Sequence, residues 1–559
     1  MRFARHPLAP ATLALTLLAA LGWGWWGYGA TGDWSLEFAD AHRLWLGHVP
    51  YRDFIPTYGI LTAAIMAPFF TFKGGALAAL WISTAALILA GIAMVLRLLR
   101  PKDGRFDAAR LALLFVATVA FLPSNSRYIL GYSTSGFVSV LLWTAFFLVR
   151  RRRPEADFLA GILLGTQCYT KLDAGLAAGG MLAFLLLLRM LRGHWRATGH
   201  LLAGFALPSA LAWIGLLAAG ARGELLWEST AEVLQQTGYV RDRILGKRLV
   251  AGGIVVLLLA ALCALPTIRE RFSLVRRGLP TAVCALLLFA VVLDSAAILG
   301  SNGARGPVAI LYFWFLCWLA VGVLMLSELF AQRSLSAALS QLEGWRWTAL
   351  LLGAAGLARC AISGWFPLNY YQPAFFLAFA WLLGSSGKSP SRGVRSMLVV
   401  AVGIALITSG FSVLPRRSVP FPTPFGTIRL QNDMRWSEPV EIYRRVRDDP
   451  APGALLCTYM TGPFVATGRE PSGLYTYGHR LAFSGSYALR REMLSLDLLR
   501  AKPPLYVLVE RERATFAPPF GAAFATELAA WISENYRQVL EYDNALGGHW
   551  TLLRRRDVP

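Results

Sequence analysis

The chain of 559 residues is apolar and basic: hydrophobic residues make up 56% of it, charged residues only 15%, and the formal net charge is +22. Soluble globular proteins contain about 25% charged residues, so this composition excludes an ordinary soluble protein and favours one with many membrane spans. The arginines gather in short loops between apolar runs, which the positive-inside rule explains without a nucleic-acid partner. The six cysteines show neither a disulfide framework nor the spacing of a metal site.

Apolar runs recur along the first three quarters of the chain at spacings typical of a polytopic membrane protein. They lie near residues 10–30, 75–97, 109–123, 135–150, 157–170, 174–191, 199–220, 250–267, 279–299, 307–329, 346–363, 370–385 and 394–414. No small-residue cleavage site of the A-x-A type stands between the first run and Asp33, so we expect that run to remain as an anchor.

Residues 59–72, GILTAAIMAPFFTF, form one more apolar run of about 14 residues, whereas a spanning helix needs about 20. If this run crossed the membrane, the basic clusters that follow it, such as 150–153, would face outward. A re-entrant or surface-lying run instead puts those clusters in the cytoplasm with the basic N-terminus, which carries Arg2 and Arg5. The charge pattern therefore predicts about thirteen spans in residues 1–414, an inner N-terminus and an outer C-terminal domain.

Residues 415–559 are more polar than the rest and are predicted to form a small extracytoplasmic α/β domain. The segments GALLCTYM, LYVLVE and HWTLLRR are typical of strands, and YALRREMLSLDLLR and AAFATELAAWISENY are typical of helices. This alternation predicts a small sheet covered by helices. No catalytic constellation is visible there, and we interpret His479 as a surface residue.

The first outer loop, residues 31–58, concentrates three carboxylates, Asp33, Glu37 and Asp40, among aromatic residues. Carboxylates placed where water meets lipid are candidates for chemistry or ion binding. A solvated juxtamembrane helix with ordinary surface acids is the alternative interpretation. Asp33 and Glu37 are four residues apart, so on a helix they would share one face.

This loop resembles the first extracytoplasmic loop of the GT-C membrane glycosyltransferases, whose bacterial members commonly read D-E-x-x-Y-x-x-x-A-x-x-x-x-x-G-x-x-P-Y-x-D-F after their first span. The matching residues are Asp33, Ala41, Gly47, Pro50, Tyr51, Asp53 and Phe54. The chain departs from the pattern at Trp34, where the family has Glu, and at Glu37, where it has an aromatic residue. The run 59–72 also resembles the amphipathic juxtamembrane segment of that superfamily.

The resemblance implies a polytopic α-helical protein of the bacterial inner membrane with an outer C-terminal domain. It also implies transfer of a sugar from a polyprenyl-phosphate donor to a lipid, glycan or protein acceptor. No Walker or Rossmann pattern is present, in agreement with a reaction that uses no nucleotide cofactor outside the cell. The family's catalytic aspartate falls on Asp33, and Glu37 would position the acceptor or serve as the base itself, unless it is a surface acid.

A lipid-phosphate leaving group requires cations near the outer lipid boundary. Lys171 and the cluster of Arg241 and Arg243 are the candidates, with lipid anchoring as the alternative, or an ion pair with Asp173 in the case of Lys171. The further candidates for substrate binding are Tyr51, Asp53, Tyr58 and Asp173. The loop 123–134, where metal-dependent members of the superfamily place a ligand, carries no acid, so we expect no metal.

Two other classes remain open from the sequence. A transporter of lipid-linked substrates would show repeated halves with charges near mid-span, and no such repeat is visible. A polysaccharide polymerase or ligase would place a large outer loop between late spans. This chain has its first long loop directly after the first span.

Overall fold

The computed structural model describes part of the chain in detail. The described residues are 33–57, 59–80, 153–170, 172–229, 418–431, 439–458, 462–476, 485–510, 520–522, 524–543 and 549–558, with a few isolated positions between them. Most of the predicted spans lie outside these ranges, so the number of about thirteen stays a prediction.

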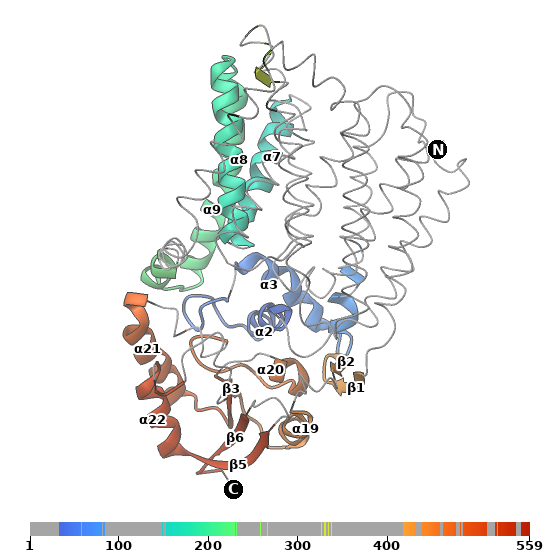
Figure 1. The fold of residues 1–559 in the computed structure, drawn as a ribbon, viewed down its shortest axis with the longest axis vertical. Helices are drawn as coiled ribbons and strands as arrows, with labels where there is room; N and C mark the ends of the chain where they lie inside the picture. Colours follow the sequence, from blue (N-terminus) through green and yellow to red (C-terminus); the bar gives the residue numbers. More distant parts are fainter. Residues whose placement is uncertain are drawn as a thin grey trace, which may run out of the picture.

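Three consecutive apolar helices lie side by side in the described part of the chain (Figure 1). They are α7 (Pro154–Thr166), which continues into the 3-10 turn η4 (Gln167–Tyr169), α8 (Leu172–Leu191) and α9 (Trp195–Ala218). These helices confirm the apolar runs predicted at 157–170, 174–191 and 199–220. Among the described helices, α9 alone is long and apolar enough to cross a membrane on length and composition.

Helices α7 and α9 approach closely because glycines line their contact. A Cβ on Gly161 or Gly165 of α7 would lie 2.3 or 2.4 Å from the carbonyl oxygens of Leu201 and Phe205, respectively. A Cβ on Gly204 of α9 would lie 2.0 Å from the carbonyl oxygen of Phe158. Small residues four apart let helix backbones meet in this way, as they commonly do inside membranes.

Gly204→Ala should therefore destabilise the protein, because the added methyl group forces the two helices apart. We expect a loss of about 1–3 kcal/mol, the usual cost of overpacking. The matched control is Gly215→Ala in the same helix, where no described atom would lie within 4 Å of the added Cβ. Thermal unfolding in detergent should show a lower Tm for Gly204→Ala alone, and equal Tm values would contradict close packing of α7 on α9.

The apolar run at 59–72 forms two short pieces. Helix α3 (Ile60–Met66) has 7 residues, and the 3-10 helix η2 (Ala67–Thr71) has 5. Pro68 stands at the start of η2, where its missing N–H interrupts an α-helical ladder. Ala63 and Met66 are buried whereas Phe72 is 59% exposed. The prediction that this run is too short to span is confirmed.

The C-terminal residues form an α/β unit around a sheet of strand order β3-β4-β6-β5, in which β3 runs parallel to β4 and the other pairs are antiparallel. The strands are β3 (Leu455–Cys457), β4 (Tyr506–Glu510), β5 (Tyr536–Asp543) and β6 (His549–Arg555). The helices are α19 (Val440–Asp448), α20 (Gly462–Thr467), α21 (Ala488–Ala501) and α22 (Thr526–Asn535). The three strands and two helices predicted from the sequence are confirmed.

A hairpin of β1 (Ser418–Thr423) and β2 (Gly426–Gln431) joins this unit to the first outer loop. Helix α2 (Asp33–Trp45) packs with α3 and η2 between the apolar helices and the C-terminal unit (Figure 1). One hydrophobic core contains Phe38 and Ala41 of α2, Met66, Phe70, and Phe421, Ile428 and Leu430 of the hairpin. The first outer loop and the C-terminal residues therefore fold against each other.

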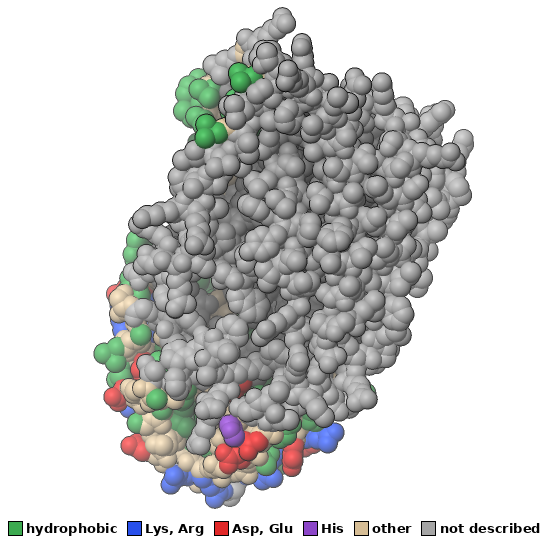
Figure 2. Space-filling model, viewed as in Figure 1, with side chains coloured by type: hydrophobic (Ala, Val, Ile, Leu, Met, Phe, Trp, Pro, Cys, Tyr) green, Lys and Arg blue, Asp and Glu red, His purple; other side chains and the backbone are tan. Residues whose placement is uncertain are grey.

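The two ends of the described structure differ in surface chemistry. Charged side chains gather over the C-terminal unit, whereas the described helices at the opposite end show apolar ones (Figure 2). Leu187, Leu191 and Trp195, at the junction of α8 and α9, are each more than half exposed. His194 and Arg196 at the same junction are exposed as well, so apolar and basic side chains lie side by side there, as is typical of helix ends at a membrane surface.

Candidate active site

Helix α2 carries a row of buried polar side chains. Ser35, Glu37, Asp40 and Arg43 are each no more than 2% exposed. Glu37, Asp40 and Arg43 are three residues apart, so they lie along adjoining turns of one side of the helix. Isolated ionised groups are costly to bury, so a buried row of this kind marks either a polar framework or a functional site.

Asp40 joins three separate parts of the chain. One carboxylate oxygen accepts a hydrogen bond from the backbone N–H of Thr57 at 2.8 Å, and the other accepts one from the hydroxyl of Thr476. Burial raises the pKa of Asp40 from its ordinary 3.8 to about 6, although these hydrogen bonds and the charge of Arg43 act in the opposite direction. Both oxygens are therefore engaged in holding α2 against the rest of its loop and the C-terminal unit.

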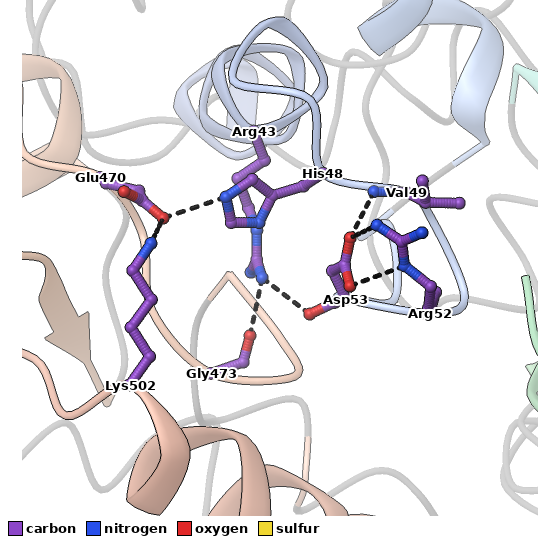
Figure 3. Close-up of polar contacts among 8 residues, drawn as sticks. All are labelled: Arg43, His48, Val49, Arg52, Asp53, Glu470, Gly473 and Lys502. Carbon is purple, nitrogen blue, oxygen red and sulfur yellow. Dashed lines mark hydrogen bonds and ion pairs between the residues drawn. The ribbon is translucent and has the colours of Figure 1, made fainter. Parts of the chain in front are cut away.

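Arg43 makes a parallel connection one turn further along α2. Its Nη2 donates hydrogen bonds to the carbonyl oxygens of Asp53 and Gly473, both at 2.9 Å (Figure 3). Its guanidinium lies 4.4 Å from the ring centroid of Phe54. Burial lowers the pKa of Arg43 to about 10, against the charges of Asp40 and other nearby acids. One side chain thus fixes both the first outer loop and the C-terminal segment.

The segment P-Y-x-D-F forms a tight turn. Tyr51 has a φ of 60°, rare for a non-glycine residue, and its N–H donates to the carbonyl of Phe54 at 2.6 Å. Asp53 accepts hydrogen bonds from the N–H of Val49 at 2.7 Å and from Arg52 at 2.8 and 2.9 Å. Burial raises the pKa of Asp53, but these bonds outweigh it, so the pKa lies below its ordinary value. Both carboxylate oxygens of Asp53 stabilise this turn.

A second polar contact, through Glu470, joins the loop to the C-terminal unit (Figure 3). Glu470 lies 3.0 Å from Nε2 of His48 and 2.8 Å from Nζ of Lys502. The hydrogen bond from His48 and the neighbouring Lys502 hold the pKa of Glu470 at about 2, below its ordinary 4.5. The carboxylate therefore stabilises the folded state only while it is charged.

Glu470→Gln should lower the free energy of unfolding at pH 7 by up to about 1 kcal/mol, since the pair is partly exposed. Because the folded-state pKa is depressed, this contribution is present above the ordinary pKa of about 4.5 and is lost as the pH falls toward 2. Unfolding of both proteins measured from pH 7 down to pH 2 should show the difference shrinking below pH 4.5. A difference that does not change with pH would contradict the ion pair.

The structure places the two proposed catalytic acids on one helix. Asp33 is the first residue of α2 and Glu37 follows one turn later, so both positions lie on the same side of it. Glu37 is 1% exposed, which argues against the surface-acid alternative. The side chain of Asp33 is outside the described structure.

The predicted phosphate-binding residues lie outside the described residues. These residues are Lys171, Arg241 and Arg243. Of the predicted substrate-binding residues, Tyr58 is also outside the described structure, and of Asp173 only the backbone is described, in the first turn of α8. Thr170, which precedes Lys171 in the sequence, accepts a hydrogen bond from the N–H of Gly59 at 3.1 Å. The turn before α8 therefore contacts the chain directly after the first outer loop. All five assignments stay predictions.

The turn that follows α9, after the predicted span 199–220, reaches the first outer loop. The carbonyl of Tyr51 accepts from the N–H of Arg222 at 3.0 Å, and Arg52 donates to the carbonyl of Ala219 at 3.3 Å. The ends of α7 and α9 and the start of α8 thus meet the loop that contacts the C-terminal unit. The turn after α7 and the turn after α9, both predicted to be outer, therefore lie at the same end of the three helices.

No metal centre is visible within the described ranges, where no group of three His, Cys, Asp or Glu side chains could hold an ion. The expectation of a metal-free mechanism stays a prediction, because the loop 123–134 is outside those ranges.

Comparison with known proteins gives similarity in structure but none in sequence. No protein-family model and no curated protein matches the chain. Among solved structures, ArnT from Cupriavidus metallidurans bound to undecaprenyl phosphate is 10% identical, over 97% of each chain, with a TM-score of 0.41. The arabinosyltransferase EmbB from Mycobacterium smegmatis is 16% identical, over 73% of this chain and 41% of EmbB, with a TM-score of 0.31.

Because both TM-scores are below 0.5, we base the functional proposal on the residues of the chain itself.

Proposed function

We propose that this chain is a membrane glycosyltransferase of the GT-C type. It moves a sugar from a polyprenyl-phosphate donor to an extracytoplasmic acceptor by an inverting displacement. The observation that carries this proposal is helix α2, which begins at Asp33, where the family motif has its leading aspartate, and buries Glu37 one turn later to 1% exposure. Buried carboxylates that accompany a catalytic motif are strong candidates for acid–base chemistry.

The proposed reaction needs a base for the acceptor hydroxyl and cations that stabilise the departing phosphate. In an inverting displacement the acceptor hydroxyl attacks the anomeric carbon, its proton passes to a carboxylate, and the polyprenyl phosphate departs. We assign the base to Asp33, with Glu37 positioning the acceptor or replacing it as the base. A carboxylate in a partly desolvated setting has a raised pKa and accepts a proton more readily at neutral pH.

The departing phosphate carries negative charge, which Lys171, Arg241 and Arg243 would stabilise. The contact between Gly59 and Thr170 supports Lys171. Thr170 directly precedes Lys171, and Gly59 directly follows the loop that holds the acids. Tyr51, Asp53, Tyr58 and Asp173 remain the proposed substrate-binding residues. The acceptor can be a lipid, a glycan or a protein.

We also propose that residues 1–414 form the membrane domain and 415–559 an outer domain at a bacterial inner membrane. Topology reporters test this arrangement directly. A reporter fused after Gly104 should behave as cytoplasmic, and one fused after Pro559 as extracytoplasmic. A cytoplasmic C-terminus would overturn the outer placement of the site.

The function itself is tested with purified protein and polyprenyl-phosphate sugars labelled in the sugar. We expect the label to appear on an acceptor from the parent membranes as free polyprenyl phosphate is released. A transporter would move the intact lipid-linked sugar across proteoliposomes without releasing the phosphate. A polymerase or ligase would require a donor carrying a glycan chain. Either result would replace the present proposal.

A further inference from the structure

Four consecutive residues of the C-terminal unit, Gly473 to Thr476, lie against the first outer loop. The carbonyl of Gly473 accepts from Arg43 at 2.9 Å, and the carbonyl of Leu474 accepts from the N–H of Ile55 at 2.7 Å. The hydroxyl of Thr476 donates to Asp40. Three of these four residues therefore hydrogen-bond to α2 or to the loop that follows it.

The other side of the same segment is held from within the C-terminal unit. The Tyr475 hydroxyl accepts from Nη1 of Arg491 at 2.7 Å, and Arg491 is fully buried on α21. The neighbouring Arg490 pairs with Glu224 and Glu228, which follow α9. The segment is thus fixed on both sides, with α2 on one and α21 on the other.

Thr476 occupies a particular place in this arrangement. Its side chain is 0% exposed, and its hydroxyl donates a hydrogen bond to Asp40, an acid of α2. The second oxygen of Asp40 is held by the N–H of Thr57. A carboxylate that is hydrogen-bonded at both oxygens can fix the rotation of a helix about its axis and its position along that axis.

We propose that Thr476 is a positioning residue for the acids of α2. By anchoring Asp40, its hydroxyl sets the orientation of the helix on which Glu37 lies three residues earlier and Asp33 seven residues earlier. The expected effect on sugar transfer rests on the proposed function, whereas the positioning of α2 by Thr476 does not. The C-terminal unit then completes the site from a point distant in the sequence.

The test uses Thr476→Val, which removes the hydroxyl and keeps the shape, and Thr476→Ser, which keeps the hydroxyl. Hydrogen exchange is measured in full-length protein on peptides that cover residues 49–57, where the N–H of Ile55 bonds Leu474 across the contact and the N–H of Thr57 bonds Asp40. Loss of a hydrogen bond to a charged group should speed exchange there by about tenfold or more in Thr476→Val. Thr476→Ser should exchange at the wild-type rate.

Thr458→Val is the matched control. Thr458 is also buried and its hydroxyl bonds Leu508 at 3.4 Å, but this contact lies within the C-terminal sheet. We expect this variant to leave exchange at residues 49–57 unchanged. Wild-type exchange there in Thr476→Val, or equal acceleration in all three variants, would overturn the proposal.

The sugar-transfer assay separates this inference from the proposed function. Thr476→Val should lower kcat by about tenfold with little change in the donor KM, and Thr476→Ser should restore kcat. If kcat is unchanged while exchange is accelerated, Thr476 does not position the acids and the proposal fails. If wild-type protein transfers no sugar, the proposed function fails while the exchange result still decides whether Thr476 holds α2.

Discussion

Asp33→Asn should reduce sugar transfer by at least about a hundredfold, the usual contribution of a positioned base. Asparagine keeps the size and shape of aspartate but cannot accept the proton of the acceptor hydroxyl. Asp33 begins α2 directly after the first apolar run, and it stands where the family motif has its leading aspartate. Transfer rates at saturating donor, measured with equal amounts of folded protein, provide the comparison.

Two further variants make the result specific. Glu37→Gln should cost less than Asp33→Asn if Glu37 only positions the acceptor, and Asp448→Asn, at an exposed position, should leave the rate unchanged. Donor binding should stay near normal in all three variants. Near-wild-type transfer by Asp33→Asn would remove Asp33 from the mechanism and make Glu37 the leading candidate for the base.

Local patterns in the sequence predicted the elements that depend on local physics. The apolar runs became α7, α8 and α9 at nearly the predicted positions, because an α-helix satisfies the backbone hydrogen bonds of an apolar run within the run itself. The shortness of the run at 59–72 likewise predicted that it cannot span, and the structure divides it into two short pieces. Strands β3, β4 and β6 were recognisable from their apolar character.

The sequence patterns did not predict the helices and strands of mixed polarity. Strand β5, YRQVLEYD, carries charged and polar residues because much of it is exposed at the edge of the sheet. Helix α19, VEIYRRVRD, has only a narrow apolar side, formed by Ile442, Tyr443 and Val446. The β1–β2 hairpin contains three prolines in or beside its first strand, a composition that rarely indicates a strand.

The framework of the candidate site could not be predicted for a different reason. Asp40 and Thr476 are 436 residues apart, and no spacing rule connects side chains across such a distance. Asp40 resembled its neighbours in the acidic loop, and Arg43 looked like one more basic residue after an apolar run. Their roles follow from burial and from partners that only the folded chain brings together.

Arg43→Met should be the most destabilising substitution in the first outer loop. It leaves the carbonyls of Asp53 and Gly473 without their donor in a buried setting, and it removes the cation from the ring of Phe54. Each buried polar group left unsatisfied costs about 1–3 kcal/mol, so we expect a loss of about 3 kcal/mol or more. Chemical denaturation in detergent, followed by tryptophan fluorescence, measures the change.

Arg447→Met provides the control, because Arg447 also lies over an aromatic ring, at 4.7 Å from the centroid of Phe421, but on the surface of the C-terminal unit. An exposed contact of this kind contributes about 0.5–1 kcal/mol. Arg43→Lys should fall between the two, since lysine keeps the charge but cannot direct a planar fork of donors at two carbonyls. Equal stability of Arg43→Met and Arg447→Met would mean that the first outer loop and the C-terminal unit are joined by their apolar core and not by this guanidinium.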